Sequence, residues 1–359
     1  MKALRVLDLE GCKELEDRHL ENIERLIQLR YLNLGETEIT ELPKQVLKLQ
    51  CLDTLDIRNT GVSELPSAFI QLGQLTRLFV DLDTRLPDRI GKMKNLEELT
   101  HVNACMYPIK FLQQLAQLNK LRELEISWDR EGTQEGDRTS YEAGLIDSLG
   151  ILTGHNLHSI NMHIIDENGF PLHTLYPAPC ALQRLHFDLK LGNISVVPAW
   201  MGSLVNLQEL SFRIRTMTQD DLDILGDIPS LCSLAFHLEE RPLTGRFRGP
   251  PNPDDWLRVR KGFQSLNGFR FICDWMCLIF EAGTMPKLEV LELEVPSGRH
   301  AIEKCGYDFG INILSCLTKV CFRFNHWGCG EEDEVAIKKA VSGHRNRPAL
   351  EITRKRPRR

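Results

Sequence analysis

The sequence predicts an α/β repeat protein, a curved horseshoe-shaped solenoid with short parallel strands on the concave face and irregular or short helical returns on the convex face. Three observations lead to this prediction. The apolar template Leu-x-x-Leu-x-Leu recurs along the chain, and most copies start 21–25 residues after the previous one. A proline often opens the segment between copies, and apolar residues then follow at every third position. The residues between these fixed positions vary from copy to copy.

Thirteen copies of the template can be aligned, and the copy at Leu96 is degenerate. The copies start at Leu4, Leu29, Leu52, Leu75, Leu96, Leu121, Leu157, Leu182, Leu207, Leu231, Leu266, Leu288 and Leu317. Their spacing lies in the range of leucine-rich repeats, about 20–29 residues. A single repeat cannot bury its leucines, so neighbouring repeats must stack to form a continuous core.

The returns between the strands are expected to be short, tight helical segments. Pro43 is followed by Val46, Leu49 and Leu52 at intervals of three, which suits 3₁₀ geometry. Prolines stand at the same place in three further returns, at Pro66, Pro87 and Pro198. Proline fits the start of a helical segment because its missing N–H would have no partner there.

Two polar segments interrupt the period, and the chain ends in a different pattern. We expect regular repeats at 1–128, a polar insertion at 129–153, repeats at 154–237, a Pro/Gly-rich insertion at 238–262, repeats and a C-terminal cap at 263–352, and a basic tail at 353–359. Both insertions are interpreted as loops, either tolerated surface insertions or loops that contact a partner.

The segment from Glu331 to Ile352 predicts an amphipathic helix followed by a short strand, which would cover the open end of the last repeat. The first repeat, at Leu4, has no comparable cap, so we expect the chain to be part of a longer protein or to be covered by another domain. The basic run Arg354–Arg359 is either a solvated tail or a nuclear-import or nucleic-acid patch.

Composition narrows the class of protein. The net charge of −6 over 359 residues gives no basic footprint, so we do not expect nucleic acid as a partner. The N-terminus does not resemble a signal peptide, and no apolar run is long enough to span a membrane. The 11 cysteines are scattered, several of them within apolar runs, which favours a reducing compartment. We therefore expect a cytoplasmic protein, with the nucleus as an alternative, and no membrane contact.

No motif in the sequence indicates catalysis, so we expect no enzyme activity, no catalytic residues and no cofactor. A nucleophile elbow, a metalloprotease helix motif and a kinase set are all missing from the sequence. One group, Cys316, Cys321, His326 and Cys329, has the residue types of a zinc site. These four residues lack a paired C-x-x-C, so ordinary scattered cysteines are the favoured interpretation and we predict no metal site.

Along each strand, every second side chain points away from the core of the repeats. These side chains should line the concave face, where solenoids bind partners. Each could also be ordinary solvated surface. An aromatic and arginine cluster comes first, then an acidic strip with an aromatic edge, then a basic strip. The candidate protein-binding residues are Tyr31, Asn33, Asp56, Arg58, Arg77, Phe79, Glu123, Glu125, Trp128, Arg184, His186, Arg213 and Arg270.

The residues within the repeats point to a particular family more specifically than the repeat length does. The phrases "LRVLDLEGC", "LRYLNLGETEITELP" and "LDTLDIRNTGVSELP" closely resemble the leucine-rich-repeat domain of plant disease resistance proteins of the coiled-coil NB-ARC class. Later, "VPAWMGSLVNLQEL" and "HRNRPALEI" are similar to the cereal members of that class. The resemblance runs from Leu4 to Ile352. It differs from the full family architecture, because the sequence contains no phosphate-binding G-x-x-x-x-G-K-[ST] loop.

The resemblance implies a protein-binding domain of an intracellular innate immune receptor. It would sense pathogen effectors directly or through a guarded host protein, and it would hold an NB-ARC module in its off state. The implied partners are therefore a pathogen effector, a guarded host protein or an NB-ARC domain. The alternative is a general intracellular leucine-rich-repeat scaffold or a ubiquitin-ligase substrate adaptor.

Overall fold

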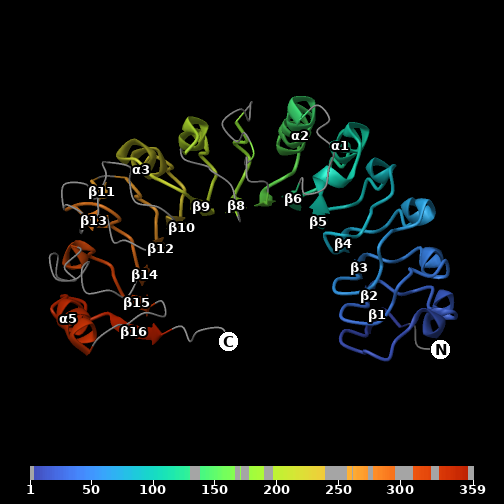
Figure 1. Ribbon diagram of the computed structural model, residues 1–359, viewed down its shortest axis with the longest axis horizontal. Coiled ribbons are helices and arrows are strands. Elements are labelled where there is room, and N and C mark those ends of the chain that lie inside the picture. Colours follow the sequence, from blue (N-terminus) through green and yellow to red (C-terminus); the bar gives the residue numbers. More distant parts are fainter. Residues whose placement is uncertain are drawn as a thin grey trace. The chain divides into compact units, whose positions relative to one another are not determined.

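The computed structural model describes residues 4–129, 138–165, 170, 178–189, 197–238, 257–260, 262–273, 278–295, 310–324 and 331–354. The chain forms two compact units. Unit 1 comprises residues 1–182 with 190–192, and unit 2 comprises residues 183–189 with 193–359. In both units short strands line one side and helical segments line the other (Figure 1). The predicted solenoid of stacked leucine-rich repeats is confirmed.

Unit 1 carries seven parallel strands that pair in chain order. They are β1 (Val6–Asp8), β2 (Tyr31–Asn33), β3 (Thr54–Asp56), β4 (Arg77–Phe79), β5 (Glu98–Asn103), β6 (Glu123–Trp128) and β7 (Ser159–Ile164). Every strand falls on a copy of the apolar template. The register aligns equivalent positions, so that Leu7, Leu32, Leu55 and Leu78 lie side by side. Each repeat therefore packs its leucines on those of the next.

Strand β5 contains a bulge that explains the degenerate copy of the template. Leu99 pairs with Leu124, but Val102 pairs with Ile126. Two residues of β5, Thr100 and His101, thus lie opposite the single residue Glu125 of β6, and His101 has a positive φ of 55°. Val102 takes the buried position that the template assigns to residue 101.

Unit 2 continues the same pattern with seven parallel strands in its main sheet. They are β8 (Arg184–Leu189), β9 (Glu209–Ile214), β10 (Ser233–Leu238), β12 (Gly268–Cys273), β14 (Val290–Val295), β15 (Lys319–Phe324) and β16 (Ala349–Arg354). A separate parallel pair, β11 (Leu257–Val259) and β13 (Leu278–Phe280), was not predicted from the sequence. Neither of these two strands falls on a copy of the repeat template, which is why the repeat pattern did not reveal them.

The returns are short helices, as predicted. The 3₁₀ helices are η1 (Asp17–Leu20), η2 (Ile23–Arg25), η3 (Val46–Lys48), η4 (Ser67–Gln71), η5 (Ile90–Lys92), η6 (Ala104–Met106), η8 (Ala199–Ser203) and η10 (Ile311–Ile313). The α-helices are α1 (Ile109–Leu115), α2 (Arg138–Thr153), α3 (Gln219–Gly226) and α5 (Glu331–Ser342). Pro66 and Pro198 directly precede η4 and η8 in extended or near-extended conformation. The predicted C-terminal helix and strand correspond to α5 and β16.

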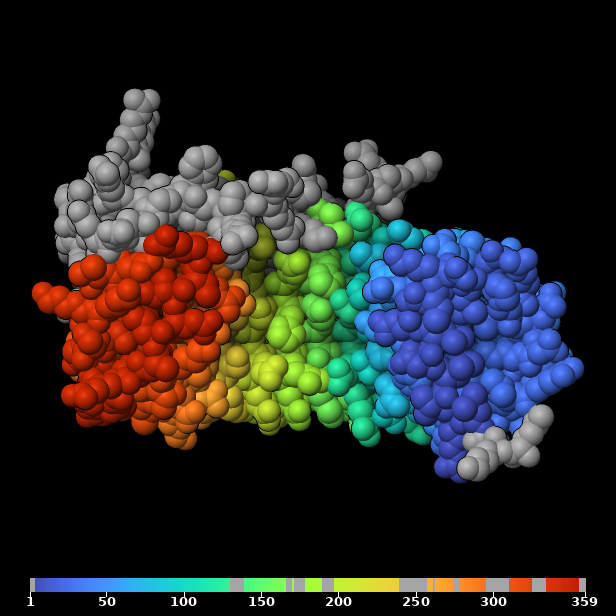
Figure 2. All heavy atoms as spheres, turned by 90° about the horizontal axis from the view of Figure 1, so that it is seen from below, coloured from blue at the N-terminus to red at the C-terminus, as the bar shows by residue number. Residues whose placement is uncertain are grey.

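The core of each unit is the stacked apolar frame. In unit 1 the leucines of the template are fully buried, with Leu32 and Leu55 at 0% exposure. In unit 2 aromatic rings take over part of the frame, and Phe236 lies between Phe212, at 5.7 Å, and Phe271, at 5.0 Å between ring centroids. Within unit 1 the colour changes gradually from blue to green in the space-filling view, so successive parts of the sequence lie next to one another (Figure 2).

The structure describes part of the first predicted insertion, and that part is a helix instead of the expected loop. Residues 138–153 were expected to form a loop, but they form α2, which buries Leu145, Leu149 and Leu152. Its Ser148 hydroxyl donates to the Leu112 carbonyl of α1 at 2.9 Å, so α2 is a return helix of its repeat. Residues 130–137 and 239–256 lie outside the described residues, as do 355–359 of the basic tail.

Candidate protein-binding face

The outward side chains of the strands form one face of each unit, which we call the strand face. Along β9, Leu210, Phe212 and Ile214 are buried, while Ser211 and Arg213 between them are partly exposed. The same alternation holds in β7 and β10. Most candidate residues predicted by alternation therefore lie on the strand face.

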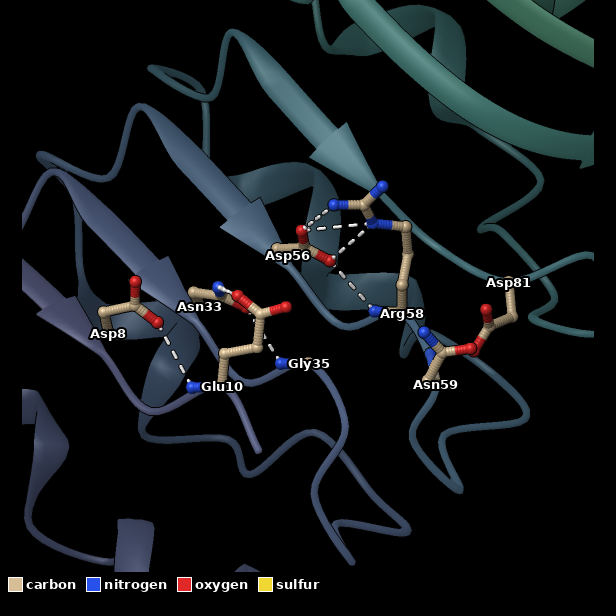
Figure 3. A network of polar contacts seen from close by, with 8 residues as sticks. All are labelled: Asp8, Glu10, Asn33, Gly35, Asp56, Arg58, Asn59 and Asp81. Atoms are coloured by element: carbon tan, nitrogen blue, oxygen red, sulfur yellow. Dashed lines mark hydrogen bonds and ion pairs between the residues drawn. The ribbon is translucent and has the colours of Figure 1, made fainter. Parts of the chain in front are cut away.

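The first three repeats use their last strand residue to hold a turn (Figure 3). Asp8, Asn33 and Asp56 lie in register at the ends of β1, β2 and β3. Each side chain accepts a hydrogen bond from the backbone N–H two residues later, at 2.9–3.1 Å. Asn33 also donates to Glu10 at 3.0 Å. The candidates Asn33 and Asp56 are 3% and 6% exposed, so their first role is to form Asx turns.

The turns that follow are held by a ladder of backbone hydrogen bonds. Glu36 and Asn59 stand at equivalent positions with φ of 56°, a conformation that asparagine adopts more readily than glutamate. The N–H of Glu36 donates to the Arg58 carbonyl at 3.0 Å, whereas the N–H of Asn59 donates to the Asp81 side chain at 2.7 Å (Figure 3). The Asp81 carboxylate thus accepts, for Asn59, the hydrogen bond that the Arg58 carbonyl accepts for Glu36 one repeat earlier.

The predicted aromatic and arginine cluster is partly assembled. Arg58 donates to both carboxylate oxygens of Asp56, and its guanidinium carbon lies 5.0 Å from the centroid of the Phe79 ring. Arg77 donates through Nε to the Thr54 hydroxyl at 2.9 Å. Tyr31 lies in the same row, on the other side of Thr54. The two arginines are thus held in fixed positions while their heads remain exposed.

Trp128 does not lie on the strand face, and the prediction that it forms an exposed aromatic edge is wrong. It is 0% exposed, and its ring packs 5.1 Å from Phe170 and 6.3 Å from Tyr141. The physical reason is alternation. Trp128 shares its side of β6 with Leu124 and Ile126, which point into the core.

The predicted acidic strip contains a hydrogen-bonded cluster centred on Glu125. His163 Nε2 lies 2.8 Å from Glu125 Oε1, and Asn161 donates to the same oxygen at 3.3 Å. His101 Nε2 lies 3.4 Å from this oxygen. A carboxylate only accepts hydrogen bonds, so His163 must carry its proton on Nε2. Sequence reasoning missed His101, because only the bulge in β5 brings it to the strand face.

Glu125 is a partly buried carboxylate that stays ionised. Burial raises its pKa, but the hydrogen bond from His163 and the charges of His101, His163 and Arg58 outweigh burial, and the net pKa lies below its ordinary value. Glu123, the other glutamate of the strip, is exposed at the start of β6.

The predicted basic strip of unit 2 lies on the strand face, at Arg184 and His186 of β8 and Arg213 of β9. Arg184 pairs in register with Glu209, so the strip is not purely basic. Burial lowers the pKa of His186, and the positive charge of Arg184 lowers it further, against the opposing effect of Glu209. His186 therefore adds little positive charge at neutral pH.

Arg270 of β12 is also balanced by acids. Its Nε lies 3.7 Å from Glu292 and its Nη2 lies 3.7 Å from Glu294, which is 4% exposed. Arg323 of β15 reaches Glu292 at 3.2 Å. Arg270 is thus part of an internal ion-pair network that spans β12, β14 and β15.

The four residues with zinc-ligand chemistry are only partly described. Cys316 is exposed and Cys321 is buried in β15, while His326 and Cys329 lie outside the described residues. Within the described ranges no three His, Cys, Asp or Glu side chains converge as a metal site would require. Nor is any described helix long and apolar enough to cross a membrane.

Comparison with known proteins identifies the family of this chain. A family profile described as "Leucine-rich repeat region" matches residues 1–350. The chain belongs to the leucine-rich-repeat family. Disease resistance protein RGA5 of Oryza sativa subsp. japonica is 31% identical to this leucine-rich-repeat chain over 363 residues, which cover 96% of the chain and 30% of RGA5. Disease resistance protein Pik-2 of the same rice is 28% identical over 366 residues, 88% of the chain and 34% of Pik-2.

These relatives confirm the resemblance to cereal disease resistance proteins. The leucine-rich-repeat chain spans about a third of the length of the curated relatives it matches. Among solved structures, a leucine-rich-repeat protein of Leptospira interrogans aligns over 97% of this chain and 90% of that chain, with 16% identity and a TM-score of 0.48.

Proposed function

We propose that this chain is the recognition and regulatory domain of an intracellular plant innate immune receptor. Its strand face binds protein, either a pathogen effector or a guarded host protein. It also restrains an NB-ARC module that this sequence does not contain. The domain acts by recognition, without catalysis or a cofactor, in the cytoplasm or the nucleus.

The observation that carries this proposal is the similarity to rice disease resistance proteins along nearly the whole chain. The strand face of unit 1 supports it. Arg58 and Arg77 are exposed there in fixed orientations next to Phe79 and Tyr31, and aromatic and arginine side chains dominate protein-binding hot spots. Side chains that are already ordered lose little entropy when a partner binds.

The alternative function is a general intracellular scaffold or a ubiquitin-ligase substrate adaptor. Both functions use a protein-binding face, so the repeats alone do not separate them. An NB-ARC segment in the genomic reading frame upstream of Met1 would decide for the immune receptor. A segment that recruits a ligase in that position would decide for the adaptor.

A direct test uses the 359-residue chain as bait against libraries of secreted proteins of cereal pathogens and of host proteins. We expect a partner that binds the wild type and loses binding to Arg77→Glu, while Val205→Glu, a change at a 54% exposed position on the turn after η8, binds normally. Partners that bind both variants equally would contradict a role for the strand face. Recovery of no partner from either library would contradict the proposed recognition function.

The regulatory half of the proposal needs its own measurement. Co-expression of the chain with the NB-ARC module of the same gene in leaf tissue should suppress the cell death that the module causes alone. Unchanged cell death in the presence of the folded chain would show that the chain does not restrain it.

A further inference from the structure

We infer that Glu125 is a preoriented acceptor for a basic side chain, an arginine or lysine, of the protein partner. The inference rests on the proposed function, since it names the chemistry of a partner at the same face. It concerns unit 1 alone, where Glu125 lies on β6 between β5 and β7.

The Glu125 carboxylate is contacted by the described residues at only one of its two oxygens. The hydrogen bonds from His163 and Asn161 and the close approach of His101 all end on Oε1. These contacts come from the strands on both sides of β6, so they fix the carboxylate plane from two directions. A carboxylate held in this way cannot rotate freely to serve a different donor.

The other oxygen, Oε2, has no donor among the described residues. No described residue donates a hydrogen bond to Oε2 of Glu125, and Oε2 is not among the buried polar atoms that lack a partner. Oε2 is therefore open to solvent, within a side chain that is only 18% exposed. A charged oxygen with two lone pairs, fixed in place and open on one side, is suited to accept a charge-assisted hydrogen bond.

A basic side chain suits this oxygen better than a metal ion or an anion does. A metal ion is not favoured, because the two imidazoles approach Oε1 from opposite neighbouring strands and no described group of three ligands could hold an ion. An anion is repelled by the ionised carboxylate. A guanidinium or an ammonium group provides both the positive charge and the N–H donors that Oε2 requires.

The surroundings also favour a cation. Glu98 and Glu123 lie in register on β5 and β6, in the row next to Glu125. On the other side, the outward residues of β7 are Ser159, Asn161 and His163, none of which carries a permanent positive charge. The charge of Arg58 also acts on Glu125, but the Arg58 guanidinium is ion-paired with Asp56. This part of the strand face therefore complements a basic segment of a partner.

The backbone at His101 fits the same account. A histidine with positive φ in a β-bulge is an uncommon conformation, and its Nδ1 is buried without a hydrogen-bond partner. This costly arrangement places the imidazole beside Glu125. His101 is thus a positioning residue for the carboxylate.

The inference can be tested on the full 359-residue chain with a small probe. The chain is labelled with ¹⁵N-histidine, and the ring signals of His101 and His163 are assigned with His101→Gln and His163→Gln variants. The probe is the peptide acetyl-Gly-Arg-Gly-amide, added up to about 50 mM at constant ionic strength, because one charge-assisted contact supports only weak binding. The control peptide carries uncharged citrulline in place of arginine.

We expect saturable shifts of both ring signals with the arginine peptide and none with the citrulline peptide. Glu125→Gln should weaken binding about tenfold, which corresponds to about 1.4 kcal/mol. Glu38→Gln, a change at an exposed glutamate outside the strand face, should leave binding unchanged. If Glu125→Gln fails to fold, the comparison of the two peptides on the wild type still decides.

Equal shifts with both peptides, or no shift with either, would overturn the inference and leave Glu125 as a purely structural acceptor. That outcome would leave the proposed function unaffected, because the partner screen tests it separately. Conversely, a partner that binds the strand face without a basic residue near Glu125 would keep the proposed function and reject this inference.

Discussion

Arg58 Nη2 lies 2.5 Å from Asp56 Oδ2, and the two residues hold each other at the end of β3. The Asp56 carboxylate also accepts the backbone N–H of Arg58 at 3.0 Å, so it fixes both the turn and the guanidinium. The side chain of Asp56 is 8% exposed and that of Arg58 is 45% exposed. The pair therefore combines a buried turn-forming group with an exposed cation held in a set orientation.

Asp56→Ala should lower the free energy of unfolding by about 1–2 kcal/mol, since it removes a charged turn acceptor whose ion pair is partly screened by solvent. It should also free the Arg58 side chain. The matched control is Asp53→Ala, which breaks the more exposed pair with Arg30 and should cost less than about 1 kcal/mol. Urea unfolding of both variants measures the difference, and equal losses would show that the Asx turn contributes nothing.

Leu32→Asp should severely destabilise the protein, because Leu32 is 0% exposed in the shared apolar frame. An unpaired charge at this position should cost more than about 3 kcal/mol. Ile27→Asp is the control, since Ile27 is 64% exposed, and its effect should stay within about 0.5 kcal/mol. A melting temperature of Leu32→Asp near that of the wild type would mean that the frame has been assigned wrongly.

Trp128→Ala should cost about 3–5 kcal/mol by opening a cavity between Phe170 and Tyr141. Trp128→Phe should cost much less, because the indole Nε1 is buried without a hydrogen-bond partner and phenylalanine keeps most of the ring contact. Thermal unfolding compares the two variants. If Trp128→Phe kept its stability but lost partner binding, Trp128 would belong to the binding face and not only to the core.

The pH dependence of stability should carry a contribution from Glu125. Its pKa in the folded protein lies below the ordinary value of 4.5, so the stabilisation is fully present above that value. It is lost as the pH falls through the folded pKa, because protonation removes the charge that His163 and His101 contact. The difference in melting temperature between wild type and Glu125→Gln should therefore shrink below pH 4.5. A difference that stays constant from pH 5 down to pH 3 would contradict this linkage.

The repeat frame could be predicted from sequence because it depends on a period that buried leucines must keep. Leu29, Leu32 and Leu34 occupy the positions that the template assigns to them, and η3 follows Pro43 as expected. The helix α2 was missed because its polar start hid the later spacing of Leu145, Leu149 and Leu152. The helical spacing of these leucines was present in the sequence, but it fell within the segment that was predicted to be an insertion.

The candidate site could be predicted only in part, because alternation gives the side of a strand and not the partners of a side chain. It could not show that Asn33 and Asp56 are committed to turns, or that Arg270 is shared between two glutamates. It also could not place His101, which reaches the strand face only through an extra residue in β5.

Hydrogen–deuterium exchange of the full chain, with and without the partner recovered in the screen, tests most directly whether the strand face recognises the partner. If the strand face binds the partner, exchange should slow in the segments that contain β3 to β7, at and after Asp56, Phe79 and Glu125, and should stay unchanged in the helical returns. Slower exchange confined to the returns, such as η3 to η5 and α1, would contradict it.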